Sequence, residues 1–595
     1  MSVRWGLTGT ADLPEDVEEI EIVRCDRVDG EETCTSPFTC TVAALTLTRA
    51  AGPVPGCRPA EGTEMYMERP VLLRSGLPTG VPIRFVLRGK SGGVTTHVGQ
   101  AGPFVLGEGE RRFVETRMYP VGQTVPLPDA RVRRFLHTAT PLPDGRILVA
   151  GGFDRAARLD ECPAALEVPA DARCWRLSAT AEALAFDVAT GQVTPIRGAM
   201  LAARAGHTAT ALPDGRVLLA GGAPEAVLAM VPQGEATVGY RFTIAPLRED
   251  GAPGALASFE IFDAFLGAAL QAPARTGDPG RGGFFGTNGA AEAGPLSQPR
   301  FFHAATAIPT RPGRVLLAGG LGRGTSAATF ELFAADKPGG FGVLRGMDDG
   351  LSVPRPLPGA AGVGEQVVVF GSGAAESDAE LADVWGRTME SDPTGSARPA
   401  TDVGFLAGEE GRPDLALQRP NVVQLDERHV VVVGWYGPRC TEDEATPIYP
   451  SDAPEDATLR LCDSPMAPAT RAVTLSAMTG AAAPTPLRPH SFGATAELRD
   501  FDGTPESRRV AITGGISNGS WGATATVDVL TGEIDESGAA VVAPPAGLSL
   551  ARPRLFHTST GVPGFGLVTL GGMTFDLGVE SIGFEEEPEV AFLAP

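Results

Sequence analysis

The stretch that decides the fold of this chain occurs twice: His137–Gly152 reads HTATPLPDGRILVAGG, and His207–Gly222 reads HTATALPDGRVLLAGG. Each copy begins with a short polar run, passes through Pro-Asp-Gly and ends in an apolar run closed by two glycines. Asp can hydrogen-bond its own backbone and Gly can take a positive φ, so the middle predicts a tight turn between two strands. Diverged copies follow at 303–320, 490–515 and 557–572. A repeat of this length predicts stacked β-sheets that bury one another's faces.

Histidines and glycine pairs recur in register in these copies. The apolar run before each glycine pair is continuous, which is typical of a strand covered on both faces. We expect each glycine pair to stand where a side chain would collide with a neighbouring sheet. We expect each histidine to fill an equivalent structural position, bonded to backbone in or beside its own unit, rather than to hold a metal. The recurring residues are His137, His207, His303, His490 and His557, with Gly151, Gly152, Gly221, Gly222, Gly319, Gly320, Gly514, Gly515, Gly571 and Gly572.

The units resemble Kelch repeats, which build β-propellers with four strands in each blade, and the resemblance covers roughly residues 120–595. Two further units are degenerate. Val367–Gly373 reads VVVFGSG and has no histidine, and Val430–Trp435 keeps the apolar run but loses the second glycine. Counting both, the resemblance implies seven blades, with six or eight as alternatives. We expect Met118–Pro126 to supply an outer strand that closes the ring with the last repeat.

Residues 1–118 contain no copy of the repeat. They read as short strands of alternating character separated by turns such as Arg88–Gly93, a spacing typical of a β-sandwich. We therefore expect an all-β protein with two parts. The first, residues 1–118, is a sandwich of the immunoglobulin or fibronectin-III kind. The second, residues 119–595, is a seven-bladed Kelch-like β-propeller.

Composition excludes several classes of protein. Hydrophobic residues make up 43% of the 595-residue chain, which indicates a globular protein despite 76 glycines and 52 prolines. The formal net charge of −23 repels phosphate backbones and anionic lipids, so we expect no nucleic-acid partner. No uncharged apolar run reaches the length of about 18 residues that a membrane span needs, so we expect no span.

Eight cysteines point to an oxidising compartment. Zinc sites need closely spaced Cys-x-x-Cys pairs, and the sequence contains none. We therefore expect disulfides in a mature exported protein, located outside the cell, at its surface or in the periplasm, with the signal peptide absent from this chain. A lipidated cysteine just before Ser2 would fit. The cysteines fall into local groups: Cys25, Cys34, Cys40 and Cys57, with three connectivities open; Cys162 with Cys174; and Cys440 with Cys462.

Long insertions fall on one side of the expected propeller. Blades alternate their connections between two faces, and the insertions Phe153–Glu182, Ala223–Ser258, Ala272–Arg300 and Pro438–Arg471 share one of them. Long loops on a rigid scaffold are where binding usually occurs, and aromatic side chains suit both protein and sugar partners. We expect this face to bind a partner; the alternative is that each aromatic packs its own loop against the rim. The candidate residues are Trp175, Tyr240, Phe242, Phe284, Phe285, Trp435, Tyr436 and Tyr449.

Catalytic motifs are scarce. The sequence has no P-loop and no His-Glu-x-x-His motif, and we expect no catalytic residue, metal or cofactor. Copper-radical oxidases related to galactose oxidase also pair Kelch-type propellers with β-sandwiches, and their metal site uses two tyrosines and two histidines, one tyrosine being cross-linked to a cysteine. The five tyrosines here form no recognisable version of that site: Tyr66, Tyr119, Tyr240, Tyr436 and Tyr449.

The chain also resembles exported or cell-surface Kelch-repeat proteins, often lipoproteins, of GC-rich bacteria such as myxobacteria. This resemblance implies a non-enzymatic binding or assembly protein. The sandwich would act as a spacer near the envelope, and the propeller would present its long loops to a protein partner. Two alternatives stay open. One is a carbohydrate-binding surface adhesin that engages an extracellular glycan. The other is a degenerate galactose-oxidase-like enzyme or another propeller enzyme.

Overall fold

The structure of the chain is a computed structural model. It describes residues 2–6, 16–28, 31–41, 57–59, 65–67, 71–74, 79–108, 113–166, 168–233, 239–248, 252, 254–266, 282–286, 294–308, 311–322, 329–335, 342–344, 357–363, 366–370, 379–383, 396–399, 415–425, 429–438, 446–447, 460–461, 469–476, 482–488, 490, 492–500, 508–516, 522–543, 548–576 and 581–593.

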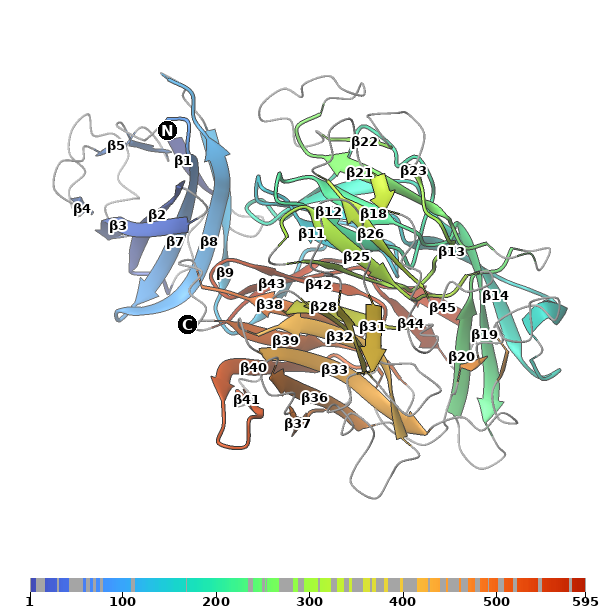
Figure 1. Cartoon of the computed structure of the whole chain (residues 1–595). Helices are drawn as coiled ribbons and strands as arrows, with labels where there is room; N and C mark the ends of the chain where they lie inside the picture. Colours follow the sequence, from blue (N-terminus) through green and yellow to red (C-terminus); the bar gives the residue numbers. More distant parts are fainter. Residues whose placement is uncertain are drawn as a thin grey trace.

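These residues form an all-β protein, as predicted. Antiparallel sheets dominate, and the helical content of the described residues is a single 3-10 turn, η1 (Ala164–Leu166). No helix in this part of the chain is long and apolar enough to cross a membrane. A curved N-terminal sheet lies beside a larger group of sheets (Figure 1).

The N-terminal part is one sheet of nine hydrogen-bonded strands. They are β1 (Ser2–Gly6), β2 (Glu19–Val28), β3 (Glu31–Thr41), β4 (Cys57–Pro59), β5 (Met65–Met67), β6 (Val71–Arg74), β7 (Pro82–Ser91), β8 (Val94–Val105) and β9 (Phe113–Pro120). They are ordered β4-β3-β2-β7-β8-β9-β1-β6-β5, with β1 parallel to β9 and the other neighbours antiparallel. The predicted turn after Arg88 is made by Gly92 and Gly93, both at positive φ.

In the described part of the chain, seven further sheets each have a path of four hydrogen-bonded strands, and one of them carries a fifth strand. The first three are β11 (Thr138–Pro141), β12 (Arg146–Ala150), β15 (Ala183–Asp187) and β16 (Gln192–Pro195); β17 (Thr208–Ala211), β18 (Val217–Ala220), β21 (Ser258–Asp263) and β22 (Gly283–Phe285), with β23 (Gly294–Pro295) also on β21; and β24 (Ala304–Ala307), β25 (Arg314–Ala318), β26 (Phe330–Ala334) and β27 (Gly342–Leu344).

The remaining four are β28 (Gly359–Val363), β29 (Gln366–Phe370), β30 (Ala379–Asp383) and β31 (Ser396–Pro399); β32 (Leu415–Gln424), β33 (His429–Pro438), β36 (Ala469–Ser476) and β37 (Ala482–Pro486); β38 (Ala494–Leu498), β39 (Arg509–Thr513), β40 (Val527–Ile534) and β41 (Ala540–Val542); and β42 (Thr558–Val562), β43 (Gly566–Leu570), β46 (Glu589–Phe592) and β10 (Thr124–Pro126).

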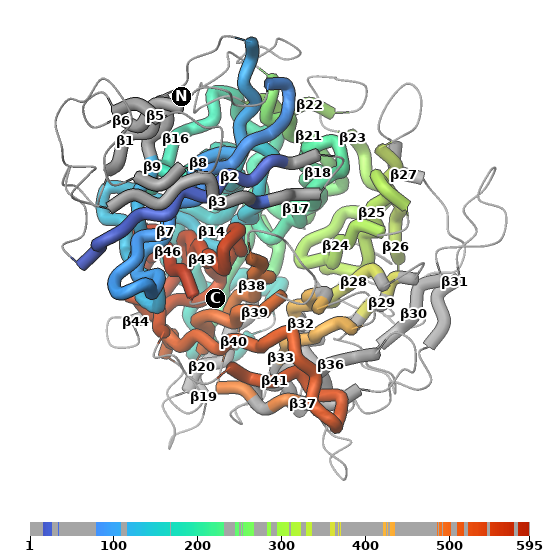
Figure 2. Tube along the Cα trace, turned by 90° about the vertical axis from the view of Figure 1, so that its left-hand side faces the viewer, coloured from blue at the N-terminus to red at the C-terminus, as the bar shows by residue number. Residues whose placement is uncertain are grey.

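The first strands of these sheets contact one another in sequence order. β11 contacts β17, β17 contacts β24, and the series continues through β28, β32, β38 and β42. β42 in turn contacts β11, so the contacts return to the first sheet. Figure 2 shows the sheets following one another around a common centre. Apolar side chains fill the spaces between successive sheets, as Leu148 and Leu219 do between the first and second.

The outer strand of the last sheet comes from the start of the chain. β10 pairs antiparallel with β46, with Val125 opposite Val590. The prediction that part of Met118–Pro126 joins the last repeat is confirmed for Thr124–Pro126, while Met118–Pro120 belongs to β9. The two ends of the repeat region are therefore hydrogen-bonded together.

The glycine pairs stand where the predicted collision would occur. Gly151 has a φ of 58°, and an added Cβ would lie 2.1 Å from the carbonyl oxygen of Arg204 in the next sheet. Gly571 repeats this relationship from the last sheet to the first, where an added Cβ would lie 2.3 Å from the carbonyl oxygen of Arg134. Gly152 donates its N–H to the Arg204 carbonyl, and Gly572 donates its N–H to the Arg134 carbonyl, both at 2.9 Å. Only glycine meets both the conformational and the spatial requirement.

The predicted insertions contain strands of their own. β13 (Phe153–Arg158) and β14 (Arg173–Ala179) come from the first repeat, β19 (Glu225–Gln233) and β20 (Gly239–Ala245) from the second, and they join in one sheet, β13-β14-β19-β20. The last repeat adds the hairpin β44 (Met573–Asp576) and β45 (Ser581–Phe584), and the fifth adds β34 (Thr446–Pro447) with β35 (Arg460–Leu461).

Two of the expected disulfides are present, Cys25–Cys34 between β2 and β3 and Cys162–Cys174 across the first insertion. Cys40 and Cys57 stand directly opposite each other in the β3–β4 register, with their side chains outside the described part. Cys440 and Cys462 both lie outside the described residues. Disulfides of this kind are typical of proteins that fold in an oxidising compartment.

Candidate functional site

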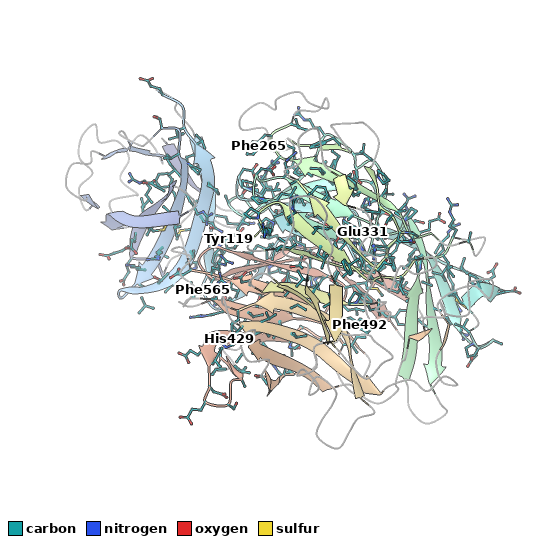
Figure 3. The ribbon with its side chains drawn as sticks, in the orientation of Figure 1. Tyr119, Phe265, Glu331, His429, Phe492 and Phe565 are labelled. Carbon is teal, nitrogen blue, oxygen red and sulfur yellow. A yellow bond between two sulfur atoms is a disulfide. The ribbon has the colours of Figure 1, made fainter. Side chains whose placement is uncertain are left out.

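A buried arginine stands three residues before each of four repeated histidines. In the second sheet, Arg204 Nη2 lies 2.7 Å from Glu260 Oε1, and neither side chain is exposed. The guanidinium also donates to the Gly221 carbonyl at 2.6 Å, and Glu260 Oε2 accepts the Leu201 N–H at 2.6 Å. This network ties the loop before the first strand to the third strand of the same sheet. Corresponding pairs are Arg300–Glu331, with Glu331 labelled in Figure 3, and Arg554–Glu589; Arg134 pairs instead with the more exposed Glu182.

The histidines bind threonine hydroxyls of the preceding sheet. Thr138 Oγ1 lies 3.0 Å from His207 Nε2, and Thr208 Oγ1 lies 2.9 Å from His303 Nε2. We predicted backbone partners, whereas these bonds join side chains of neighbouring sheets. Burial, and secondarily the charge of Arg134, lowers the pKa of His137 to about 3. The imidazole is therefore neutral near neutral pH and serves as a hydrogen-bonding link between sheets.

His490 does not occupy the histidine position of the repeat. The residue before each repeated position has a positive φ, and in the sixth unit this residue is Phe492, so Gly493 takes the histidine's place. His490 stands three residues earlier, where other units have arginine. Its Nδ1 lies 2.8 Å from the Gly514 carbonyl oxygen and its Nε2 lies 3.2 Å from an Asp528 carboxylate oxygen. Our prediction of equivalence was wrong here, because this imidazole replaces a guanidinium in the carboxylate network.

Backbone hydrogen bonds link five units around the centre. The Leu136 N–H donates to the Phe556 carbonyl at 3.0 Å, Gly206 to Leu136 at 2.9 Å, Phe302 to Gly206 at 2.9 Å, and Phe556 to Phe492 at 3.0 Å. All five residues have φ between 53° and 61°. Such a conformation costs energy in a residue with a side chain and persists only where the surroundings impose it. Figure 3 shows Phe492 inside the group of sheets.

A small pocket of about 200 Å³ lies beside these linked residues. It is below the range of about 300–1,000 Å³ that is usual for small-molecule sites. Among the described residues, no group of three or more His, Cys, Asp or Glu side chains is arranged to hold a metal. The pocket is lined by Leu136, His137, Gly206, His207, Phe302, His303, Leu357, Pro358 and Asn421.

Three of the predicted binding aromatics are core residues. Trp175 is 4% exposed and packs edge-on against Phe575 with ring centroids 5.5 Å apart, which joins β14 to β44. Phe284 and Phe285 are also buried, and Phe284 packs against Phe262. A partner-binding role does not fit this burial. Tyr240 and Phe242 lie in β20, and Trp435 and Tyr436 in β33, with side chains outside the described part; all of Tyr449 lies outside it.

The N-terminal sheet packs against the turn face, the face formed by the turns β11–β12, β15–β16, β17–β18 and β42–β43. The Tyr119 hydroxyl donates to the Val188 carbonyl at 3.0 Å, and the Arg117 N–H donates to the Ala189 carbonyl at 2.6 Å. The Tyr119 ring also stacks on Phe592, with centroids 5.7 Å apart. Burial raises the pKa of the Tyr119 hydroxyl above its usual value, so it remains a hydrogen-bond donor. These contacts fix the two parts relative to each other.

The opposite side carries the inserted strands. We call β13, β14, β19, β20, β44 and β45 the loop face; Figure 1 shows these strands on the side of the larger group of sheets that lies away from the N-terminal sheet. The Cys162–Cys174 disulfide closes the segment between β13 and β14. On this face Arg155 is 75% exposed, and the Arg133 guanidinium lies 4.2 Å above the Phe584 ring. The loop face therefore contains an ordered sheet with its own hydrophobic core.

Neither a scan against protein-family models nor a search of curated proteins finds a match to this chain. Its role is therefore inferred from its own fold and surfaces.

Proposed function

We propose that this chain is an exported, non-enzymatic binding or assembly protein built on a Kelch-like, seven-bladed β-propeller. In this proposal, the seven four-stranded sheets are the blades and the N-terminal sheet is a sandwich-like domain. The return of the first-strand contacts from β42 to β11 supports the ring, as does the pairing of β10 with β46. The carbonyl bonds from one glycine pair to the next sheet support it independently.

Export is supported by the disulfides. Cys25–Cys34 and Cys162–Cys174 each close a short segment, and such bonds persist outside the reducing cytosol. The net charge of −23 suits a soluble surface that avoids anionic lipid. The same proposal includes a lipid anchor before Ser2, which would hold the N-terminal sheet next to the envelope.

The main support for a binding role is that the N-terminal sheet and the inserted strands lie on opposite sides of the seven sheets. The N-terminal sheet covers part of the turn face through Tyr119, while the insertions of three repeats build the loop face on the far side (Figure 1). A protein held through its N-terminal part would therefore present the loop face outward. Loops and inserted elements on a rigid scaffold are where recognition concentrates. We propose that this face binds a protein partner.

The test compares capture by matched variants of the full chain. The immobilised protein is exposed to envelope extract and culture medium of its source organism. One loop-face variant reverses charges on β13 and β14, Arg155→Glu with Arg176→Glu. A second loop-face variant, Tyr240→Ala with Phe242→Ala, removes the predicted aromatics of β20. The control reverses two arginines outside the loop face, Arg216→Glu in the β17–β18 turn and Arg499→Glu directly after β38. We expect a protein retained by the unmodified chain and the control, and lost from either loop-face variant. Equal retention by all four, or no retention, would contradict the proposal.

A further inference from the structure

A second candidate site lies between the N-terminal sheet and the turn face. The cavity there has a volume of about 700 Å³, within the usual range of small-molecule sites of about 300–1,000 Å³. Arg84 and Gln100 of the N-terminal sheet contribute to one wall, and the tips of three turns between first and second strands contribute to the other. Interfaces between domains are among the preferred places for ligand sites.

The walls of this cavity are fixed by specific contacts. The bonds from Tyr119 and Arg117 to Val188 and Ala189 hold one side. At the first turn, a Cβ added to Gly145 would lie 2.1 Å from the Gly102 carbonyl oxygen, so the two backbones approach as closely as glycine permits. The volume therefore lies between two parts of the chain that touch directly at this turn.

Phe265 supplies an exposed aromatic ring at this cavity. It lies in the tight turn that follows β21, where its N–H donates to Asp263 Oδ1 at 2.8 Å. The residue is 51% exposed, whereas Phe262 in the preceding strand is completely buried. Figure 3 shows Phe265 on the part of the ring nearest the N-terminal sheet, as it shows Tyr119. An aromatic side chain left half exposed beside a cavity offers an apolar surface for stacking.

The charged groups of the cavity are balanced. Two arginines, Arg84 and Arg146, and two aspartates, Asp187 and Asp214, line it. Arg146 forms an ion pair of 2.7 Å with Asp144, and Asp214 forms one with Arg216, so part of this charge is already neutralised within the protein. A strongly charged ligand gains little from such a site. Hydroxyl groups, which donate and accept hydrogen bonds, match carboxylates, guanidinium groups and amides equally well.

We propose that this cavity binds a neutral oligosaccharide, with one sugar ring stacked on Phe265 and its hydroxyl groups hydrogen-bonded to the polar walls. The ligand class follows from the combination of an exposed ring, balanced charge and a volume suited to a small ligand. This site is separate from the loop face and does not depend on the protein partner proposed for that face. Together they would let the protein hold a surface glycan on one side and a protein on the other.

Two variants remove the site by opposite means. Phe265→Ala deletes the stacking ring. Ala211→Trp adds bulk at an exposed position that lines the cavity, and so fills the space without removing a contact. Val542→Ala is the matched control, because Val542 is another exposed apolar residue, 37% exposed, in the outer strand β41 and outside the cavity lining. Melting temperatures of all variants verify that they are folded.

The probe is a printed array of neutral oligosaccharides, followed by isothermal titration calorimetry with each one retained. We expect the full chain and Val542→Ala to bind a common set of oligosaccharides, Phe265→Ala to bind them about tenfold more weakly, and Ala211→Trp to lose binding. No retention at millimolar concentration, or equal affinities for all four proteins, would overturn the proposal. Protein capture by the loop face should be unaffected by these variants, which separates failure of this site from failure of the other.

Discussion

The Thr558 hydroxyl in the last sheet lies 2.9 Å from His137 Nε2 in the first, although 421 residues separate them in the sequence. The same bond joins Thr138 to His207 and Thr208 to His303. In the sixth sheet, Ala494 stands at the threonine position, and Thr513 of the neighbouring strand supplies the hydroxyl for His557 at 2.9 Å. The last and first sheets are therefore joined by the same threonine–histidine hydrogen bond that joins consecutive sheets elsewhere.

Replacement of Thr558 should weaken this closure. Thr558→Val preserves the shape of the side chain but removes the hydroxyl, which leaves the buried His137 Nε2 without its partner. We expect the free energy of unfolding to fall by about 1–3 kcal/mol, the cost of an unsatisfied buried polar group. Chemical denaturation measures the loss. Thr194→Val in the outer strand β16 is the control, and an equal effect at both positions would contradict a special role for the His137 bond.

Acid should destabilise the protein through its buried histidines. Burial, and then the charge of nearby arginine, lowers the pKa of His137 and His303 to about 3. In the unfolded chain a histidine titrates near about 6.5, so between these values the unfolded state binds more protons. Stability is thus complete above the unfolded pKa and is lost as the pH falls towards the folded one.

The expected slope is about 1.4 kcal/mol per pH unit for each such histidine in that window. Denaturation at successive pH values measures it, and His303→Gln should reduce the slope by the contribution of one histidine. A slope unchanged by this substitution would show that other groups cause the acid sensitivity.

The buried pair Arg204–Glu260 should be sensitive to loss of one partner but less so to loss of both. Arg204→Met leaves an uncompensated carboxylate where neither side chain is exposed, and we expect a loss of about 3–5 kcal/mol. Arg204→Met combined with Glu260→Leu should recover most of that loss, because no charge remains buried. Denaturation of both single variants and the double variant measures the coupling, and additive losses would contradict it.

Gly151 and Gly92 make a matched test of the glycine pairs. Their φ values are 58° and 56°, but a Cβ at Gly151 would meet Arg204, whereas a Cβ at Gly92 has nothing within 4 Å. Both Ala substitutions carry the same backbone cost of about 1–2 kcal/mol. Gly151→Ala should cost clearly more, through the collision with the next sheet. Equal melting temperatures for the two variants would argue against sheets packed this closely.

Removal of the Cys162–Cys174 disulfide should destabilise the loop face. The bond closes a segment of 12 residues, and its loss in Cys162→Ala with Cys174→Ala should cost about 3 kcal/mol. Thermal melting with and without reductant measures this cost and that of the remaining disulfides. If reductant leaves the melting of the unmodified chain unchanged, the exported assignment loses its main support.

Local sequence patterns predicted the strands and turns well, because Pro-Asp-Gly turns and continuous apolar runs determine backbone conformation over a few residues. The pairing of β10 with the last repeat was also predictable, since the expected propeller leaves the last repeat short of its outer strand. The buried arginines were missed even though Arg134, Arg204, Arg300 and Arg554 each precede a histidine by three residues. Arginine is rarely buried, so the residue type alone predicts an exposed side chain. The recurring Arg-x-x-His spacing was the signal that could have revealed these buried arginines.

The aromatics and His490 show where sequence reasoning fails. Trp175 was expected at the surface because its segment appears as a loop, but β13, β14, β19 and β20 form a sheet with a core of their own. That sheet combines insertions from two different repeats. A local sequence pattern cannot predict the pairing of β14 with β19, because the two strands lie far apart in the sequence. His490 was aligned by residue type, whereas the backbone position with positive φ at Phe492 sets the register.

The most direct test of the account is hydrogen exchange on the complex with the captured protein partner. The proposal predicts slower exchange of amides in β13, β14, β19 and β44 when the partner is bound, with little change at the turns of the turn face. Protection confined to β7, β8 and β9 or to those turns would contradict it, since the partner would then bind on the side that carries the N-terminal sheet.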